Sequence, residues 1–185
     1  MYKESLKIKG EATISVCDMT SQEALDLQER IVKATGKKYR KLVNELHSRF
    51  LKRQVVIENL CPTVGRAVIA ARLGGITTYT GTINYCALGT DATGSDNANT
   101  VLGTETFRKL IASATFADNL AYISSFFTAT ETTGTYQEVG HFIDGTGSVD
   151  TGQLFSRIAS PETAELPITK SNTESLTVDY KITIS

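Results

Sequence analysis

The two ends of the chain show a regular alternation of apolar and polar residues. Near the N-terminus the apolar side chains fall on even positions, at Leu6, Ile8, Ala12, Ile14 and Val16. Near the C-terminus the same alternation runs through Leu176, Val178, Tyr180, Ile182 and Ile184. Residues two apart lie on the same face of a β-strand, so each end predicts a long half-buried strand. We therefore expect both termini to be tied into sheets.

A helical pattern replaces the alternation over residues 19–51. Thr20 and Glu23 have the spacing of a capping box, and Gly36 occupies a position that suits a helix end or a hinge. Beyond Gly36, apolar residues recur at Tyr39, Leu42, Val43, Leu46 and Phe50. This spacing places them on one face of an amphipathic helix. The segment predicts a helical hairpin that is inserted after the first strand and projects from the body of the protein.

The rest of the chain predicts one more short helix and a series of short strands. A strand is expected over 54–58, and a helix then begins at Pro62 and is stopped by Gly74 and Gly75. Another strand follows over 83–88. Turn-forming Gly, Asn and Asp residues separate the remaining strands, which are expected over 107–116, 120–130, 135–143, 153–160 and 174–184.

Together these elements predict a mainly β (α+β) protein. We expect an antiparallel β-sandwich that forms a single domain over residues 1–185, with one short packed helix and the α-helical hairpin 19–51 inserted within it. A chain of 185 residues is large enough to bury a core without disulfides. The three cysteines, Cys17, Cys61 and Cys86, are an odd number without CxxC spacing, which argues against a disulfide framework and a zinc site.

The net charge of −1 hides an uneven distribution. Between Gln28 and Arg53 there are nine basic residues against Glu29 and Glu45, so this segment carries +7 and the remainder −8. A basic block on an acidic body favours contact with an acidic partner, either protein or nucleic acid. The residues that we expect to make this contact are Arg30, Lys33, Lys37, Lys38, Arg40, Lys41 and Arg49.

The polar loop over residues 89–104 is the first candidate site. Its oxygen-bearing side chains, Asp91, Asp96, Asn97 and Asn99, have a spacing at which calcium could bind. The order of an EF-hand is not met, however, and neither a GxGxxG nor a P-loop signature for phosphate is present. We therefore expect a connector in which Asp91 and Asp96 form turns, with no metal and no cofactor.

Two further features bear on catalysis. Asp150, Thr151 and Gly152 form the triplet that aspartic proteases use, but the flanking glycines indicate a hairpin turn rather than the end of an apolar strand. His47 and His141 are the only histidines, and no GxSxG motif accompanies either. With no convergent set of acids, bases and ligands, the sequence predicts a protein that is not an enzyme.

Three blocks of the chain resemble a pattern found in tailed-phage and prophage structural proteins. The first block, "NYCALGTDATGSDNANTVLGTETFRKLIAS", matches the pattern at Ala87, Leu88, Gly89, Thr90, Leu102, Glu105, Arg108 and Lys109. The second, "FFTATETTGTYQEVGHF", matches it at Phe127, Ala129, Glu131, Gly134, Glu138, Gly140 and Phe142. The third is "ITKSNTESLTVDYKITIS", with Tyr180 at an aromatic position. The resemblance covers most of residues 53–185, and the helical segment before it is a departure from the pattern.

The resemblance implies a small, non-enzymatic β-sandwich on the surface of a virion or phage-like particle. Its expected role is assembly, as a tail, baseplate, fibre-attachment or capsid-decoration protein whose partners are other virion structural proteins and copies of itself. Such a protein is made in the host cytoplasm and located in the virion, and no apolar stretch of the chain predicts a membrane partner. The alternatives are a nucleic-acid-binding module that uses the basic hairpin and a hydrolase that uses Asp150.

Overall fold

The structure is a computed structural model that describes residues 7–161 and 163–185. The helices are α1 (Gln22–Val32), α2 (Gly36–Phe50) and α3 (Thr63–Leu73). The strands are β1 (Ile8–Asp18), β2 (Leu51–Glu58), β3 (Ile83–Gly89), β4 (Glu105–Leu110), β5 (Ser113–Ala117), β6 (Leu120–Phe127), β7 (Gly134–Tyr136), β8 (Glu138–Ile143), β9 (Gln153–Ala159), β10 (Ile168–Lys170) and β11 (Glu174–Ile184). The predicted mainly β fold is confirmed. Leu6, which was predicted to lie in the first strand, is outside the described residues.

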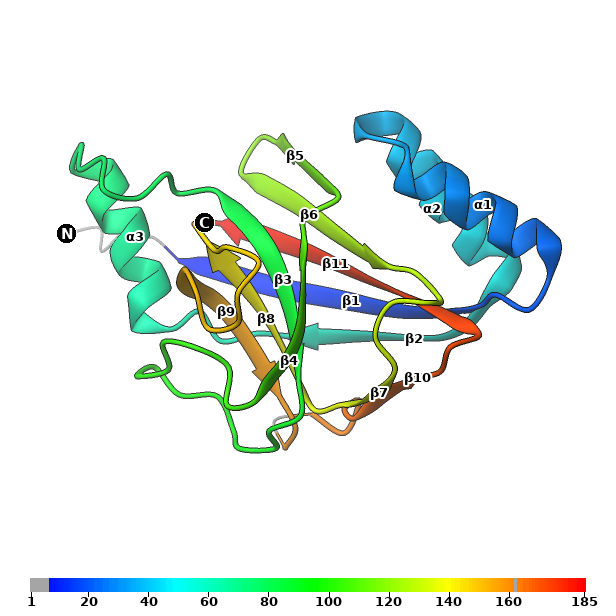
Figure 1. Ribbon diagram of the computed structural model, residues 1–185. Coiled ribbons are helices and arrows are strands. Elements are labelled where there is room, and N and C mark those ends of the chain that lie inside the picture. The colour runs from blue at the N-terminus through cyan, green and yellow to red at the C-terminus, as the bar shows by residue number, and fades with distance from the viewer. Residues whose placement is uncertain (1–6, 162) are drawn as a thin grey trace.

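Two antiparallel sheets face each other. One has five strands in the order β2-β1-β11-β6-β5, and the other has four in the order β4-β3-β8-β9 (Figure 1). The strands at the two ends of the chain, β1 and β11, pair along their whole length, from Ile8 opposite Ile184 to Asp18 opposite Glu174. The prediction that both ends of the chain enter a sheet is therefore confirmed.

The main core lies between the two sheets. The five-stranded sheet contributes buried side chains such as Ile14 and Val178, and the four-stranded sheet contributes Leu88 and Ile158. Along β1 and β11 the core side chains are the apolar members of the alternating patterns, and polar residues such as Thr13 and Asp179 lie on the outer face. The period of two thus separates the core from the outer surface along these two strands.

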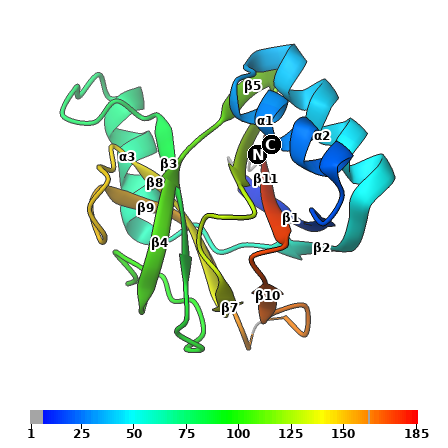
Figure 2. The same cartoon turned by 45° about the vertical axis from the view of Figure 1, so that its right-hand side comes forward.

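Helices cover parts of both outer faces. Figure 2 shows α3 beside the four-stranded sheet and the α1–α2 hairpin on the opposite side of the sandwich. Helix α3 approaches β9 closely at Gly65, where an added Cβ would lie 2.8 Å from the Cα of Phe155. The glycine in this helix is therefore needed for the close contact with the strand.

The helical hairpin packs against the five-stranded sheet instead of projecting from it. Its apolar faces, including Leu27, Ile31 and Leu46, form a second core with Cys17 of β1 and Phe126 of β6. The expectation of a projecting hairpin was wrong because the apolar stripes of both helices need a surface on which to be buried. The outer face of the sheet provides that surface.

The ends of the two helices differ in detail from the predicted ones. Ser21, not Thr20, caps α1, and its Oγ accepts a hydrogen bond of 3.2 Å from the backbone N–H of Ala24. Gly36 does not end the first helix but begins the second, with a φ of +54° that a glycine adopts without strain. The predicted hinge is confirmed. The predicted capping box was wrong, because the N3 residue after Ser21 is Ala24, which cannot return a side-chain hydrogen bond.

Three strand boundaries also differ. The predicted strand 107–116 is two strands, β4 and β5, which belong to different sheets, and 135–143 is likewise divided into β7 and β8. The short strand β10 was not predicted, and it pairs only with β7. In the two divided strands the chain passes from one sheet to another within a continuous strand-forming sequence, so the local pattern has no interruption to mark the division.

Candidate functional site

The loop over residues 89–104 is built around a buried ion pair between Glu138 and Arg157. Glu138 Oε2 lies 2.8 Å from the Arg157 guanidinium, and both side chains are almost completely buried. Glu138 also accepts hydrogen bonds from the backbone N–H groups of Gly103 and Thr104, at 2.9 and 2.8 Å. Because charged partners and several hydrogen bonds satisfy both groups, the pair anchors the two ends of the loop to β8 and β9.

The two acids once considered for calcium serve different roles in this loop. Asp91 Oδ2 accepts a hydrogen bond of 3.0 Å from Arg157. The pKa of Asp91 is lowered mainly by a hydrogen bond from Thr93 and further by this contact with Arg157. Asp96 accepts from the backbone N–H of Ala98 at 2.7 Å, the geometry of an Asx turn. Within the described residues no group of three acids, histidines or cysteines could hold a metal ion.

The loop also has a packing role. Its Leu102 is buried on the outer face of the four-stranded sheet, where it contacts the cluster of Ala87, Phe142 and Leu154. Gly89 and Gly140 permit this close fit, because an added Cβ would lie 2.4 Å from Glu138 Oε1 at the first and 2.8 Å from Leu102 at the second. The loop thus covers a third small core, and these two glycines of the phage-like pattern are needed for its geometry.

The remaining charged residues of the phage-like pattern are paired as well. Arg108 and Glu105 form an almost fully buried ion pair of 2.5 Å, and Arg108 Nη1 donates to the carbonyl oxygens of Thr146 and Thr151 at 3.1 and 3.0 Å. Lys109 pairs with Glu131 at 2.5 Å in a half-buried position. These residues therefore hold strands and turns together and are not free for chemistry.

Lys170, in the third block of the pattern, has the most unusual environment of any lysine in the described residues. Its buried Nζ donates to the carbonyl oxygens of Glu131 and Thr132 at 2.9 and 3.0 Å, and to those of Ala129 and Ser171 at 3.2 Å each. Burial lowers the pKa of Lys170 to about 8, so the side chain still carries its proton at neutral pH. The ammonium group acts as an internal cation that closes the turn between β6 and β7.

Asp150 lies in an exposed turn between β8 and β9, with a φ of +58°. Its backbone N–H donates to Glu105 Oε2 at 3.3 Å, and Thr151 Oγ1 donates to the carbonyl oxygen of Ser148 at 2.7 Å. The following Gly152 also has a positive φ, of +87°. The triplet is a hairpin turn, as its flanking glycines predicted.

The two histidines lie on different elements, His47 on α2 and His141 on β8. His47, on α2, is 3.3 Å from Thr177 Oγ1, and burial lowers its pKa. His141 is fully buried on β8, where its Nδ1 is 2.9 Å from Ser156 Oγ. Burial lowers the pKa of His141 to about 3, so the ring is neutral in the folded protein.

All seven basic residues chosen on the hairpin are exposed, but they are not equivalent. Arg49 pairs with Glu23 and Glu45, and Lys33 lies 4.0 Å from Glu29. Arg40 hydrogen-bonds to Thr115 and lies over the ring of Tyr122, 5.3 Å from its centroid.

Among the described residues, the side chains of four of the seven have no ion-pair or hydrogen-bonding partner, namely Arg30, Lys37, Lys38 and Lys41. Lys37, Lys38 and Lys41 form one exposed basic cluster in the first half of α2, which we call the lysine cluster.

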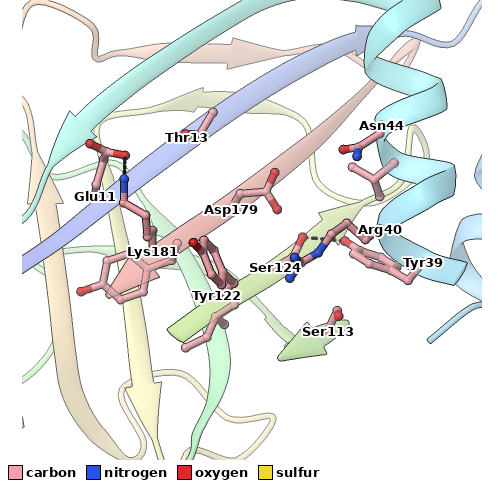
Figure 3. A pocket seen from close by; sticks show the side chains of 13 residues that line it. Glu11, Thr13, Tyr39, Arg40, Asn44, Ser113, Tyr122, Ser124, Asp179 and Lys181 are labelled. Atoms are coloured by element: carbon pink, nitrogen blue, oxygen red, sulfur yellow. Dashed lines mark hydrogen bonds and ion pairs between the residues drawn. The ribbon is translucent and has the colours of Figure 1, made fainter. Parts of the chain in front are cut away.

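A pocket that the sequence did not predict lies between α2 and the outer face of the five-stranded sheet, with a volume of about 260 Å³ (Figure 3). Its floor is a row of polar residues that are paired across four neighbouring strands, namely Thr13, Asp179, Ser124 and Ser113. One wall is formed by Tyr39, Arg40 and Asn44 of α2, and the opposite wall by Tyr122 together with the ion pair of Lys181 and Glu11.

Hydrogen bonds connect the helix wall to the floor of this pocket. Tyr39 Oη is 2.8 Å from Ser124 Oγ, and Ser124 also hydrogen-bonds to the carboxylate of Asp179. Burial raises the pKa of Asp179 above its usual value, while Ser124, His47 and Arg40 oppose the shift. Asp179 forms no ion pair within 4.0 Å among the described residues, which leaves its carboxylate directed toward the pocket (Figure 3).

The polar odd positions of the last strand were the only sequence signal for this site. Thr177, Asp179 and Lys181 alternate with the apolar core residues, so they had to face outward together. The helix that forms the other wall lies more than a hundred residues earlier in the chain. No local pattern connects the two, and the pocket therefore emerges only from the packing of the hairpin.

The exposed surface also includes one prominent aromatic side chain. Phe116 on β5 is 83% exposed, and β5 is an edge strand of the five-stranded sheet. None of the five residues of β5 is charged, whereas the opposite edge strand, β2, carries Lys52, Arg53 and Glu58. Charges on an edge strand discourage pairing with other chains, so β5 is the less protected edge.

In the part of the chain that the structure describes, no helix has both the length and the apolar character that crossing a membrane requires. Comparison with known proteins finds no family model, no curated protein and no solved structure that matches this chain.

Proposed function

We propose that this protein is a non-enzymatic structural component of a tailed-phage virion or phage-like particle, where it acts by protein–protein assembly. The observation that carries the proposal is the contrast between its buried and exposed charges. The charged residues of the phage-like pattern are committed to internal ion pairs, as in Glu105–Arg108 and Lys109–Glu131, whereas the lysine cluster is exposed and unpaired. A scaffold whose pattern residues are paired internally, and which exposes a cluster of unpaired charges, suits association with a partner better than it suits catalysis.

The partner that fits this surface is an acidic protein. The lysine cluster lies at the start of α2, whose first turn contains no acidic residue, so the positive end of the helix dipole adds to the lysine charges. The remainder of the chain is acidic, with −8 outside the segment from Gln28 to Arg53. A neighbouring copy of the same chain could therefore present the complementary charge, and many weak contacts of this kind gain strength in a repeating particle.

The first test is whether the chain is present in particles. Virions or phage-like particles from the phage or lysogen that encodes the chain would be purified and analysed by quantitative mass spectrometry. We expect the protein to be particle-associated in many copies. Its absence from intact particles, with other structural proteins detected, would rule out the virion role.

The second test addresses the hairpin. The triple change of Lys37, Lys38 and Lys41 to Glu should lower the amount of protein in particles at least tenfold, because it reverses the charge of the proposed contact. A matched control changes Lys7, Lys9 and Arg72 to Glu, three exposed residues outside the hairpin, with the same change in net charge. Equal incorporation of both variants would show that the lysine cluster is not the contact.

The exposed lysines also keep one alternative open, a module that binds nucleic acid. That function predicts binding of duplex DNA or single-stranded RNA at ~50 mM salt, with affinity that falls steeply as salt is added. The charge-reversed triple variant should then lose binding, while the control triple variant should keep most of it. Measurable salt-dependent binding together with absence from particles would favour this alternative over the virion role.

A further inference from the structure

The pocket between α2 and the sheet contains several polar groups that have no partner within the protein. The side chains of Thr13, Asn44 and Ser113 line it, and among the described residues none of them forms a hydrogen bond to another protein group. Asp179 adds a carboxylate that is only hydrogen-bonded by Ser124. Hydroxyl and amide groups can donate and accept, whereas the carboxylate accepts, so the pocket offers both kinds of hydrogen bond to one occupant.

The charges around the pocket balance. Lys181 and Glu11 neutralise each other at 2.6 Å on one wall, and the negative charge of Asp179 is opposed by Arg40, which is close enough to lower its pKa. Asp179 in the floor would repel an anionic ligand, and Arg40 beside the mouth would repel a cationic one. The electrostatics of the site therefore favour a neutral ligand.

Size and shape restrict the ligand further. The volume of about 260 Å³ is below the ~300–1,000 Å³ of pockets that hold drug-sized molecules. The ring of Tyr122 also lines the pocket, and the Arg40 guanidinium of α2 lies over part of it, 5.3 Å from the ring centroid (Figure 3). A small molecule with hydroxyl groups on its rim and C–H groups on its face would match both the polar groups and this ring.

We propose that this pocket binds a neutral polyhydroxylated molecule of the size of a single pyranose sugar. The sugar hydroxyls would hydrogen-bond to Asp179 and Thr13 in the floor and to Asn44 in the wall. The C–H face of the sugar would lie against the part of the Tyr122 ring that Arg40 does not cover. The paired Lys181 and Glu11 would define the far end of the site. This inference does not depend on the virion role, since it is based on the pocket alone.

The test is a titration of the full ¹⁵N-labelled chain, followed by NMR, with D-glucose, D-galactose, D-mannose and N-acetyl-D-glucosamine in turn. We expect at least one sugar to shift the amide signals of α2, β6 and β11 around the pocket, with saturation near ~10 mM. L-Arginine and acetate serve as the cationic and anionic probes, and each should bind at least tenfold more weakly than the best sugar.

Two variants connect the shifts to the site. Asn44→Ala removes an exposed side chain that makes no internal hydrogen bond, so the protein should fold normally and bind the sugar at least tenfold more weakly. Lys41→Ala, on the same helix but outside the pocket, should bind as the unchanged protein does. Absence of shifts with all four sugars, tighter binding of L-arginine or acetate, or equal affinity of both variants would overturn the proposal.

Discussion

The imidazole ring of His141 stacks on the phenol ring of Tyr180, with ring centroids 4.4 Å apart and planes inclined by 14°. The two rings come from different sheets, His141 from β8 and Tyr180 from β11, so the stack joins the halves of the sandwich at its centre. His141 is completely buried and its Nε2 has no hydrogen-bond partner among the described residues. The contact therefore requires a neutral imidazole.

This relationship predicts a loss of stability in mild acid. Burial lowers the pKa of His141 to about 3, whereas an unfolded histidine titrates near 6.5, so between these values only the unfolded chain binds the proton. The free energy of unfolding should fall as the pH drops through this window, by up to about 1.4 kcal/mol per pH unit from this group. Urea denaturation at a series of pH values between 7 and 4 measures the slope.

The variant His141→Phe keeps an aromatic ring in the stack and removes the titrating group. Its stability should fall less steeply than that of the unchanged protein between pH 6.5 and 4.5, even though it leaves Ser156 Oγ without its partner. The acidic residues titrate in both proteins and cancel in the comparison. Identical slopes would mean that His141 does not control the acid sensitivity.

The buried pair of Glu138 and Arg157 should be the most sensitive point of the loop 89–104. Glu138→Gln keeps the shape of the side chain but leaves the Arg157 guanidinium buried without its closest counter-charge. We expect the free energy of unfolding to decrease by about 3–5 kcal/mol. The amides of Gly103 and Thr104, which donate to Glu138, should also lose protection from hydrogen exchange.

Asp96→Ala is the matched control for this prediction. It removes an exposed acid of the same loop whose contact is a local turn, so the loss should be about 1 kcal/mol or less. Added calcium should leave the melting temperature of the unchanged protein as it is. A calcium-dependent increase that disappears in Asp96→Ala would instead show a metal site in this loop.

The contrast between these two acids illustrates what the sequence could predict. Asp96 acts through a residue two positions away, so its turn-forming role follows from local composition. Glu138 acts through Arg157 and through a loop that lies more than thirty residues earlier, and no local pattern encodes that meeting. The alternation in β1 and β11 revealed which side chains face the core, but it contained no information on which strands share a sheet.

The same reasoning explains the division of residues 107–116. Phe107 of β4 and Ile111 of the link between β4 and β5 both contact the main core, so the apolar pattern continues across the division. The pocket was missed for a related reason, since its floor and its helical wall come from segments that only the folded hairpin brings together. Short-range periodicity predicted the elements, and long-range packing decided their partners.

Lys170 should also be difficult to replace. Lys170→Met keeps most of the apolar stem but removes the ammonium group, which leaves four carbonyl oxygens without their donor. We expect a loss of about 2–4 kcal/mol in the free energy of unfolding. Lys109→Met, which breaks the half-exposed pair with Glu131, should cost no more than about 1 kcal/mol. Similar losses for both lysines in thermal or urea denaturation would contradict the proposed role of Lys170.

Asp179 should behave in the opposite way, because its replacement relieves an unfavourable burial. The raised pKa means that the folded protein disfavours the charged carboxylate relative to the unfolded chain. The loss of stability caused by burying this charge is absent below pH 3.8, the ordinary pKa, and is fully present above the raised pKa of the folded state. Asp179→Asn, whose amide oxygen can still accept from Ser124, should therefore stabilise the protein at pH 7, by up to about 1 kcal/mol.

The gain should disappear at pH 3, where the carboxyl group of the unchanged protein is already neutral. Asp118→Asn, an exposed change on the turn between β5 and β6, serves as the control and should alter stability little at either pH. Urea denaturation of the three proteins at the two pH values gives the comparison. If Asp179→Asn were less stable at pH 7, the carboxylate would be contributing a favourable charge interaction, and the attraction of Arg40 would outweigh the cost of burial.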